Sequence, residues 1–149
     1  FEAMNPQFPR SVRHLCHTAA DLLCAHRGEV VFEKGDACNR MLFVDHGMVL
    51  YDAVSSVDGS AEVDGTESFD SHGDGQAELR GLALRRGEWL SEAALWVEWI
   101  NQGRLTSGSN AGPTWLITVN MQEFATTTRQ YEAAYALSVL FAKQFVERL

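Results

Sequence analysis

Short apolar runs separated by glycine-containing turns fill the sequence between residues 28 and 51, and no other feature limits the fold as strongly. The runs cover residues 29–33, 40–44 and 48–51, and the turns between them cover 34–36 and 45–47. Strands this short, with turn residues about every eight to twelve positions, are typical of all-β barrels and sandwiches. Glycine supplies the positive φ angles that tight corners require. The segment therefore predicts a small, glycine-cornered β-barrel.

The rest of the chain adds strands and places helices at both ends. Apolar runs predict further strands at 79–84, 105–109 and 115–119. Apolar residues at helical spacing predict an N-terminal helix that begins near Arg10 and ends before Gly28, a helix from Met121 capped by Asn120, and a final helix over 131–149. With 149 residues the chain is long enough for one core and too short for two ordinary domains. We expect a single domain, 1–149, mainly β with flanking helices.

One acidic segment, residues 53–78, interrupts this pattern. Ser, Gly, Asp and Glu dominate it, and its few large apolar residues follow no period. The acidic residues between 52 and 79 number eight, without any Lys or Arg, so they account for the whole net charge of -8. A segment of this composition cannot bury enough apolar surface to offset the conformational entropy that ordering would cost. We predict a disordered acidic insertion that the barrel tolerates.

Composition disfavours some classes of partner and compartment. The chain has no basic stripe, so it is not expected to bind nucleic acid. No apolar run is long enough to span a membrane, and no direct membrane contact is expected. Cys16, Cys24 and Cys38 form no disulfide pattern, which favours a reducing, cytoplasmic setting. Because the chain begins with Phe1, we expect a larger parent protein, and an intracellular part of a membrane protein stays open.

The stretch from residue 85 to residue 104 carries the candidate chemistry. A turn at Arg86-Gly87 leads into a short helix, for which Ser91 is the expected cap and Glu92 an acid near the first turn. The start of a helix exposes backbone N–H groups that suit a phosphate. Arg104 could return to the same place and add a charge-assisted pair of hydrogen bonds. An acid, free amides and an arginine together would suit a nucleotide.

These features together resemble a cyclic nucleotide-binding domain. The resemblance rests on Gly28-Glu29-Val30-Val31-Phe32, Gly35-Asp36, the strand 41–44, Gly47, the run 87–95 and the closing helices. It implies a double-stranded β-helix (jelly-roll) barrel with an N-terminal helix, a short cassette helix and C-terminal helices that close over bound cAMP or cGMP. The Trp-rich run 89–99 and the tail 142–149 look most like the cytoplasmic domains of voltage-gated cation channels.

The resemblance also implies which residues would bind the ligand. The family's cassette reads Phe-Gly-Glu-x-Ala-Leu, followed by an Arg and a small residue. Carried over by position, Leu90 replaces Phe, Ser91 replaces Gly, and Glu92 is the acid for the ribose 2′-hydroxyl. The other expected ligand-binding residues are Ala93, Ala94, Arg104, Leu105 and Thr106, with Arg104 as the phosphate arginine if 96–100 includes a few extra positions. No catalytic residue, metal or resident cofactor is expected.

Departures from the family pattern leave the function open between two main alternatives. Ser91 replaces a glycine, and Trp96 and Trp99 are bulky, which favours a regulatory domain of a larger protein, by resemblance an ion channel. Its nucleotide site would be degraded, and it would couple to other domains or subunits through protein–protein contacts. The alternative is a working cAMP or cGMP sensor in which the C-terminal helix closes. A remote alternative, a cupin-like metalloenzyme, needs clustered histidine ligands, whereas His46 stands alone beside a turn glycine and His26 and His72 have no partners in register.

Overall fold

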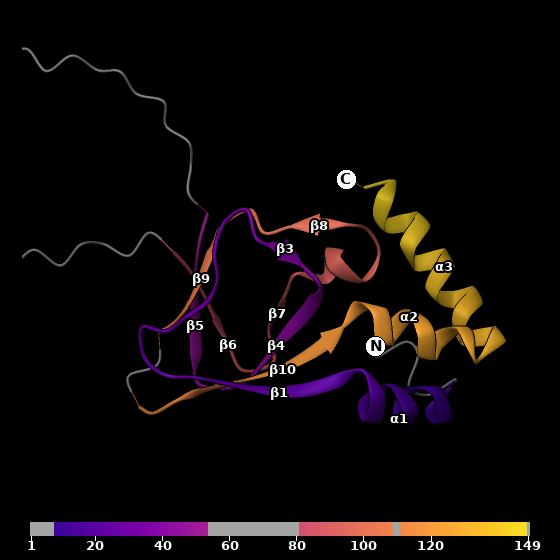
Figure 1. Cartoon of the computed structure of the whole chain (residues 1–149), viewed down its shortest axis with the longest axis horizontal. Helices are drawn as coiled ribbons and strands as arrows, with labels where there is room; N and C mark the ends of the chain where they lie inside the picture. The colour runs from indigo at the N-terminus through magenta and orange to yellow at the C-terminus, as the bar shows by residue number, and fades with distance from the viewer. Residues whose placement is uncertain (1–7, 54–80, 109–110, 149) are drawn as a thin grey trace, which may run out of the picture.

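Two four-stranded antiparallel sheets and a two-stranded pair form the centre of the computed structural model, which describes residues 8–53, 81–108 and 111–148 (Figure 1). The first sheet has the order β1 (Ala20–Ala25), β10 (Thr114–Asn120), β4 (Arg40–His46) and β7 (Trp89–Leu90). The second sheet has the order β2 (Val30–Phe32), β9 (Arg104–Ser107), β5 (Met48–Asp52) and β6 (Leu82–Arg85). The remaining pair joins β3 (Ala37–Cys38) to β8 (Trp99–Ile100). The predicted fold class, mainly β with flanking helices in a jelly-roll arrangement, is confirmed.

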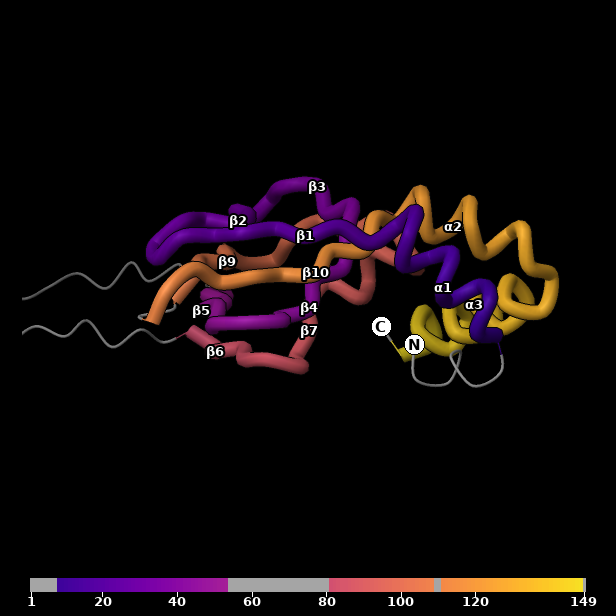
Figure 2. Tube along the Cα trace, turned by 90° about the horizontal axis from the view of Figure 1, so that it is seen from below, coloured from indigo at the N-terminus to yellow at the C-terminus, as the bar shows by residue number. Residues whose placement is uncertain are grey.

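The three α-helices gather at one end of the strands (Figures 1 and 2). They are α1 (Pro9–Thr18), α2 (Met121–Arg129) and α3 (Glu132–Val146), and a 3-10 helix, η1 (Glu92–Leu95), lies between β7 and β8. An apolar cluster joins this end to the first sheet, with Leu15 from α1, Met41 from β4 and Phe124 from α2. None of the helices in the described ranges is long and apolar enough to cross a membrane.

The main core lies between the two sheets. Leu42, Val44 and Leu116 come from the first sheet, and Val49, Leu84 and Leu105 come from the second. Side chains alternate between the two faces of a strand, so in β9 the buried Leu105 and Ser107 face inward while Arg104 lies exposed. The same alternation decides where the candidate site residues of β9 point.

A buried hydrogen-bond network fixes the end of the barrel opposite the helices. The hydroxyls of Ser107 and Thr114 lie 2.8 Å apart, and the Thr114 hydroxyl also donates to the carbonyl oxygen of Met48 at 3.0 Å. Gly47, with φ of +85°, approaches Thr114 so closely that a Cβ atom would lie 2.8 Å from the Thr114 Oγ1. Gly47 therefore serves both as a left-handed corner and as a site of close packing.

The N-terminal helix is shorter than the sequence pattern predicts, and this part of the prediction is wrong. Helix α1 ends at Thr18, and residues 20–25 form strand β1. All six residues of β1 are in register with β10, from Ala20 opposite Val119 to Ala25 opposite Thr114. Pairing along the edge of the first sheet supplies hydrogen bonds for every backbone group that faces β10, and this outweighs the local helical spacing.

The other predicted elements agree with the structure to within a few residues. Each predicted strand corresponds to one of β2, β4, β5, β6, β9 and β10, while the two-residue strands β3, β7 and β8 were not predicted. Asn120 caps α2 as predicted, since its side-chain oxygen accepts from the backbone N–H groups of Gln122 and Glu123. The predicted acidic insertion at 53–78 lies, apart from Ala53, outside the described residues.

Candidate functional site

The segment that corresponds to the cassette, residues 87–95, begins at the turn between β6 and β7. Backbone hydrogen bonds join this turn to β4. Gly87 has φ of +87° and donates its N–H to the carbonyl oxygen of Val44 at 2.9 Å. The N–H of Val44 donates in return to the carbonyl oxygen of Glu88 at 2.9 Å. Leu90 then pairs with Leu42 of the first sheet. These contacts hold the start of η1 against the barrel.

Ser91 adopts a left-handed backbone conformation at the start of η1. Its φ of 61° is the one positive value outside glycine in the described part of the chain. Ser91 is the N-cap residue of η1, as expected, but its side chain makes no capping hydrogen bond. A residue with a Cβ atom costs roughly 1–2 kcal/mol in this conformation. The glycine of the family pattern would avoid this cost, so the sequence departure at Ser91 introduces local strain.

A cavity of about 390 Å³ lies between the cassette and the second sheet, and we call it the cassette cavity. The cassette contributes Leu90, Ser91, Glu92 and Ala93 to its lining. The sheet contributes Tyr51 and Leu84, and α3 contributes Phe145. This volume falls within the range of small-molecule sites, about 300–1,000 Å³. Size therefore leaves room for a small ligand, and the charge of the lining becomes the deciding property.

The structure brings together only the first half of the predicted site. Leu90, Ser91, Glu92 and Ala93 line the cassette cavity, and Ala94 is buried beside them. The three predicted residues of β9, Arg104, Leu105 and Thr106, are not part of the lining.

The positions of the β9 residues explain their absence from the cavity. Leu105 is fully buried in the main core, and Thr106 is half-buried on the other face of the strand. The Nε of Arg104 lies 3.3 Å from a carboxylate oxygen of Glu33, and both side chains are about half exposed, at 51% and 53%. Arg104 therefore forms an ion pair at the protein surface and does not line the cassette cavity.

Asn101, and not Arg104, belongs to the lining of the cassette cavity. It follows β8, lines the cavity, and is only 5% exposed. Two backbone hydrogen bonds hold it: its N–H donates to the carbonyl oxygen of Asp36, and the N–H of Gly35 donates to its carbonyl oxygen, each at 2.9 Å. Its side-chain Oδ1 is buried without a hydrogen-bond partner in the described structure. No motif in the sequence singles out this asparagine.

The lining of the cassette cavity carries negative but no positive charge. Glu92 is its acid, and the Nε1 of Trp89 lies 3.3 Å from a carboxylate oxygen of Glu92. No Lys or Arg belongs to the lining within the described ranges. An anion in this cavity would meet backbone amides and the Asn101 side chain without a counter-charge.

Trp96 and Trp99 lie in different surroundings. Trp99 lines the cassette cavity, as expected from the sequence. Trp96 instead packs edge-on against Phe124 of α2, with ring centroids 5.6 Å apart. Trp96 also borders a second hollow of about 530 Å³ between η1 and α3, which Glu92, Phe145 and Arg148 line as well. Trp89 and Trp99 therefore border the cavity in which a nucleotide would lie, and Trp96 does not.

No group of three or more His, Cys, Asp or Glu side chains in the described ranges is close enough to coordinate a metal ion. His14, which the sequence places near Cys16 and His17, lies 3.1 Å from the hydroxyl of Tyr131 through its Nδ1.

Comparison with solved structures finds chains of similar fold. The sensor domain of the transcriptional regulator DNR from Pseudomonas aeruginosa matches all of this chain and 83% of its own, with a TM-score of 0.63 and 16% identity. The N-terminal domain of a transcriptional regulator from Streptomyces coelicolor matches 87% of this chain and 75% of its own, with a TM-score of 0.60 and 18% identity.

A third neighbour carries the name of the resemblance drawn from the sequence. A cyclic nucleotide-binding-like protein from Brucella abortus matches 85% of this chain and 90% of its own, with a TM-score of 0.56 and 16% identity. No protein-family model and no curated protein sequence matches the chain. By its architecture the chain has the fold of a cyclic nucleotide-binding-like domain.

Proposed function

We propose that this chain is a regulatory domain that has kept the cyclic nucleotide-binding fold and does not bind cAMP or cGMP tightly. The observation that carries the proposal is the cassette cavity, in which Asn101 lies in the lining and Arg104 pairs with Glu33 at the surface. The domain acts through contacts with other domains or subunits of its parent protein. It performs no catalysis.

The charge of the cavity decides between binding and non-binding. A cyclic phosphate carries one negative charge, and Glu92 in the same cavity adds another. Losing a charge-assisted pair of hydrogen bonds costs on the order of 2–5 kcal/mol, or roughly thirty- to several-thousand-fold in affinity. An asparagine amide is a neutral donor and recovers only a small part of this.

The parent protein is proposed to be a signalling protein in a reducing, cytoplasmic setting. The neighbours described above are named as transcriptional regulators and as a cyclic nucleotide-binding-like protein, and none of those three names mentions a channel. The ion channel suggested by residues 89–99 and 142–149 therefore remains a prediction from the sequence.

A working cyclic nucleotide sensor is the second candidate, and one feature of α3 favours it. Phe145 lines the cassette cavity, and Arg148, three residues further on, lines the adjoining hollow together with Glu92. A movement of α3 toward the cassette could bring the Arg148 guanidinium to a bound phosphate. Ligand would then favour the closed state by its differential affinity for it.

Titration calorimetry with cAMP and with cGMP distinguishes the two candidates. We expect no saturable heat from the wild-type chain at about 1 mM of either nucleotide, which corresponds to a binding free energy weaker than about −4 kcal/mol. Binding below about 10 μM would overturn the proposal in favour of the sensor, and Arg148→Gln would then show whether α3 supplies the counter-charge.

A gain-of-function variant tests whether the missing positive charge limits the affinity for nucleotide. Asn101→Arg introduces a cation into the cassette cavity, and we expect it to raise the affinity for both nucleotides by at least about tenfold. Asn101→Gln is the matched control, because it lengthens the side chain without charge. Circular dichroism establishes that each variant is folded. Equal binding by the arginine and glutamine variants would show that charge is not what limits this site.

A further inference from the structure

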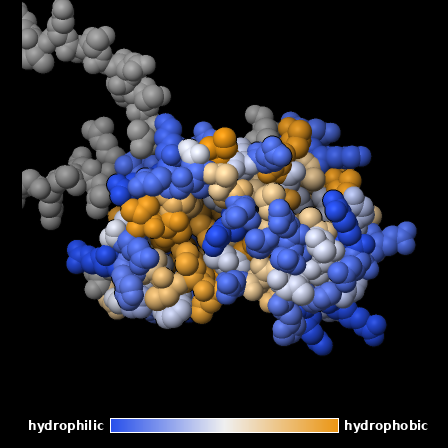
Figure 3. All heavy atoms as spheres, in the orientation of Figure 1, coloured by the Kyte–Doolittle hydropathy of each residue, from blue (hydrophilic) through white to orange (hydrophobic). Residues whose placement is uncertain are grey.

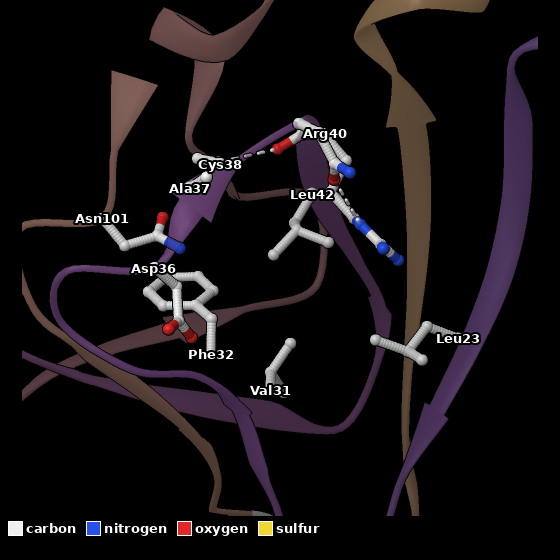
Figure 4. Close-up of a pocket in the computed structure, with 10 residues that line it drawn as sticks. Leu23, Val31, Phe32, Asp36, Ala37, Cys38, Arg40, Leu42 and Asn101 are labelled. Atoms are coloured by element: carbon white, nitrogen blue, oxygen red, sulfur yellow. Dashed lines mark hydrogen bonds between the residues drawn. The ribbon is translucent and has the colours of Figure 1, made fainter. Parts of the chain in front are cut away.

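A separate cavity of about 260 Å³ opens on the other side of Asn101, where β2 and β3 approach β1 and β4, and we call it the β3 cavity. Figure 3 shows an apolar hollow with hydrophilic groups at its border on this face of the molecule. Its apolar wall consists of Leu23, Val31, Phe32 and Leu42 (Figure 4). The volume is several times the roughly 30 Å³ that one water molecule takes up in the liquid. The β3 cavity therefore has room for a small organic molecule.

One end of the β3 cavity presents hydrogen-bond acceptors. Asn101 lies at this end (Figure 4), and its Oδ1 is buried without a hydrogen-bond partner in the described structure. Asp36 lies at the same end, and one of its carboxylate oxygens, Oδ2, accepts the N–H of Glu33 at 2.9 Å. Buried acceptors are almost always paired with a donor. An N–H or O–H group of a ligand would donate the hydrogen bond that the Oδ1 of Asn101 lacks.

The opposite side of the β3 cavity presents a cation. Arg40 lies across the cavity from Asn101 and Asp36 (Figure 4). Its Nε donates to the side-chain oxygen of Asn39 at 3.2 Å, which orients the guanidinium and leaves its terminal nitrogens available. The ion pair between Arg104 and Glu33 does not involve Arg40. A guanidinium held in this way suits a carboxylate.

We infer that the β3 cavity is a second ligand site, for a small molecule with an amino group at one end, an apolar body, and a carboxylate at the other. The amino group donates to the Oδ1 of Asn101 and lies beside the Asp36 carboxylate. The apolar body packs against Leu23, Val31 and Leu42, and the carboxylate pairs with Arg40. The site differs from the cassette cavity in charge and in wall, and it shares only Phe32 and Asn101 with it.

Titration of the ¹⁵N-labelled chain with 4-(aminomethyl)benzoate, followed by amide chemical shifts, tests this site. We expect saturable shifts concentrated at residues 31, 37, 38 and 101. Two probes lack one end each: 4-methylbenzoate has no amino group, and 4-methylbenzylamine has no carboxylate. Each is expected to bind at least about tenfold more weakly, in line with the loss of one charged hydrogen bond. Equal binding of all three probes, or no shift at about 10 mM of the first, overturns the inference.

Three variants connect the binding to the named residues. Arg40→Gln and Asn101→Leu are each expected to weaken 4-(aminomethyl)benzoate at least about tenfold. Arg27→Gln removes another exposed arginine that lines neither cavity, and it is expected to leave binding unchanged. Arg40 is exposed, so its replacement does not threaten folding even if Asn101→Leu does. Unchanged binding in Arg40→Gln also overturns the assignment.

Discussion

The Nε of Arg104 lies 3.3 Å from a carboxylate oxygen of Glu33, across the outer surface of neighbouring strands. Both side chains are about half exposed, and exposed ion pairs contribute about 0–1 kcal/mol to stability. We therefore expect Arg104→Gln to lower the free energy of unfolding by less than about 1 kcal/mol, and to leave nucleotide binding as it is in the wild type. Urea denaturation measures the first, and calorimetry the second. Glu33→Gln should behave in the same way, and a loss of several kcal/mol from either variant would contradict this placement.

Gly47 is expected to be the least replaceable corner glycine with a positive φ. A Cβ atom there would lie 2.8 Å from the Oγ1 and 3.0 Å from the Cα of Thr114, and the φ of +85° adds its own strain. Gly47→Ala should destabilise the fold by about 2–5 kcal/mol. Gly28→Ala is the control, because its φ is +78° but no atom lies within 4 Å of the added Cβ. It should cost only about 1–2 kcal/mol in thermal or urea denaturation. Equal losses would mean that strain alone matters at Gly47.

Ser91 offers the reverse case, in which glycine should stabilise. Its φ of 61° strains any residue with a Cβ atom, and its side chain makes no capping hydrogen bond. Ser91→Gly should raise the free energy of unfolding by about 0.5–1 kcal/mol, after the extra entropy of glycine in the unfolded chain offsets part of the gain. Ser91→Ala keeps the strain and should change stability by less than about 0.5 kcal/mol. A destabilised glycine variant would show that the Ser91 side chain contributes contacts to the cassette.

Asn120 joins the last strand to α2 and should contribute measurably to stability. Its Oδ1 accepts from the N–H groups of Gln122 at 2.9 Å and Glu123 at 3.1 Å. Asn120→Ala leaves both donors without this acceptor, and we expect a loss of about 1 kcal/mol. Asn120→Asp keeps an acceptor at the same position and should retain most of the stability. Denaturation of the three proteins side by side measures the difference, and an equal loss in both variants would point to a role other than capping.

Local pattern predicted most of the strands because each is bounded by residues with strong conformational preferences. Gly35 and Gly47 adopt the positive φ angles that the turn prediction requires, and Asn120 caps the helix that follows β10. Strand β1 was missed because its apolar residues also fit a helical spacing. Only pairing with β10, almost a hundred residues away along the chain, decides for the strand.

Of the candidate site, too, the sequence predicted one part and missed another. Residues 90–93 are contiguous, so their order along the chain was enough to place them together at one cavity. Arg104 was expected to return to that cavity, and this required knowing how many residues separate the end of η1 from the start of β9. Instead, the segment that contains β8 places Asn101 in the lining of the cavity. Because side chains alternate between the two faces of β9, Arg104 points outward.

The amino-acid sequence by itself determined the fold class, the glycine corners, the cap of α2 and the cassette as a contiguous unit, because each depends on the preferences of neighbouring residues. Tertiary structure alone decided that residues 20–25 are a strand, that Arg104 pairs with Glu33, and that Asn101 stands between two cavities. These depend on strand register and on which face of a strand each side chain occupies. A shift of one residue reverses every such face, and the paired strands lie far apart along the chain.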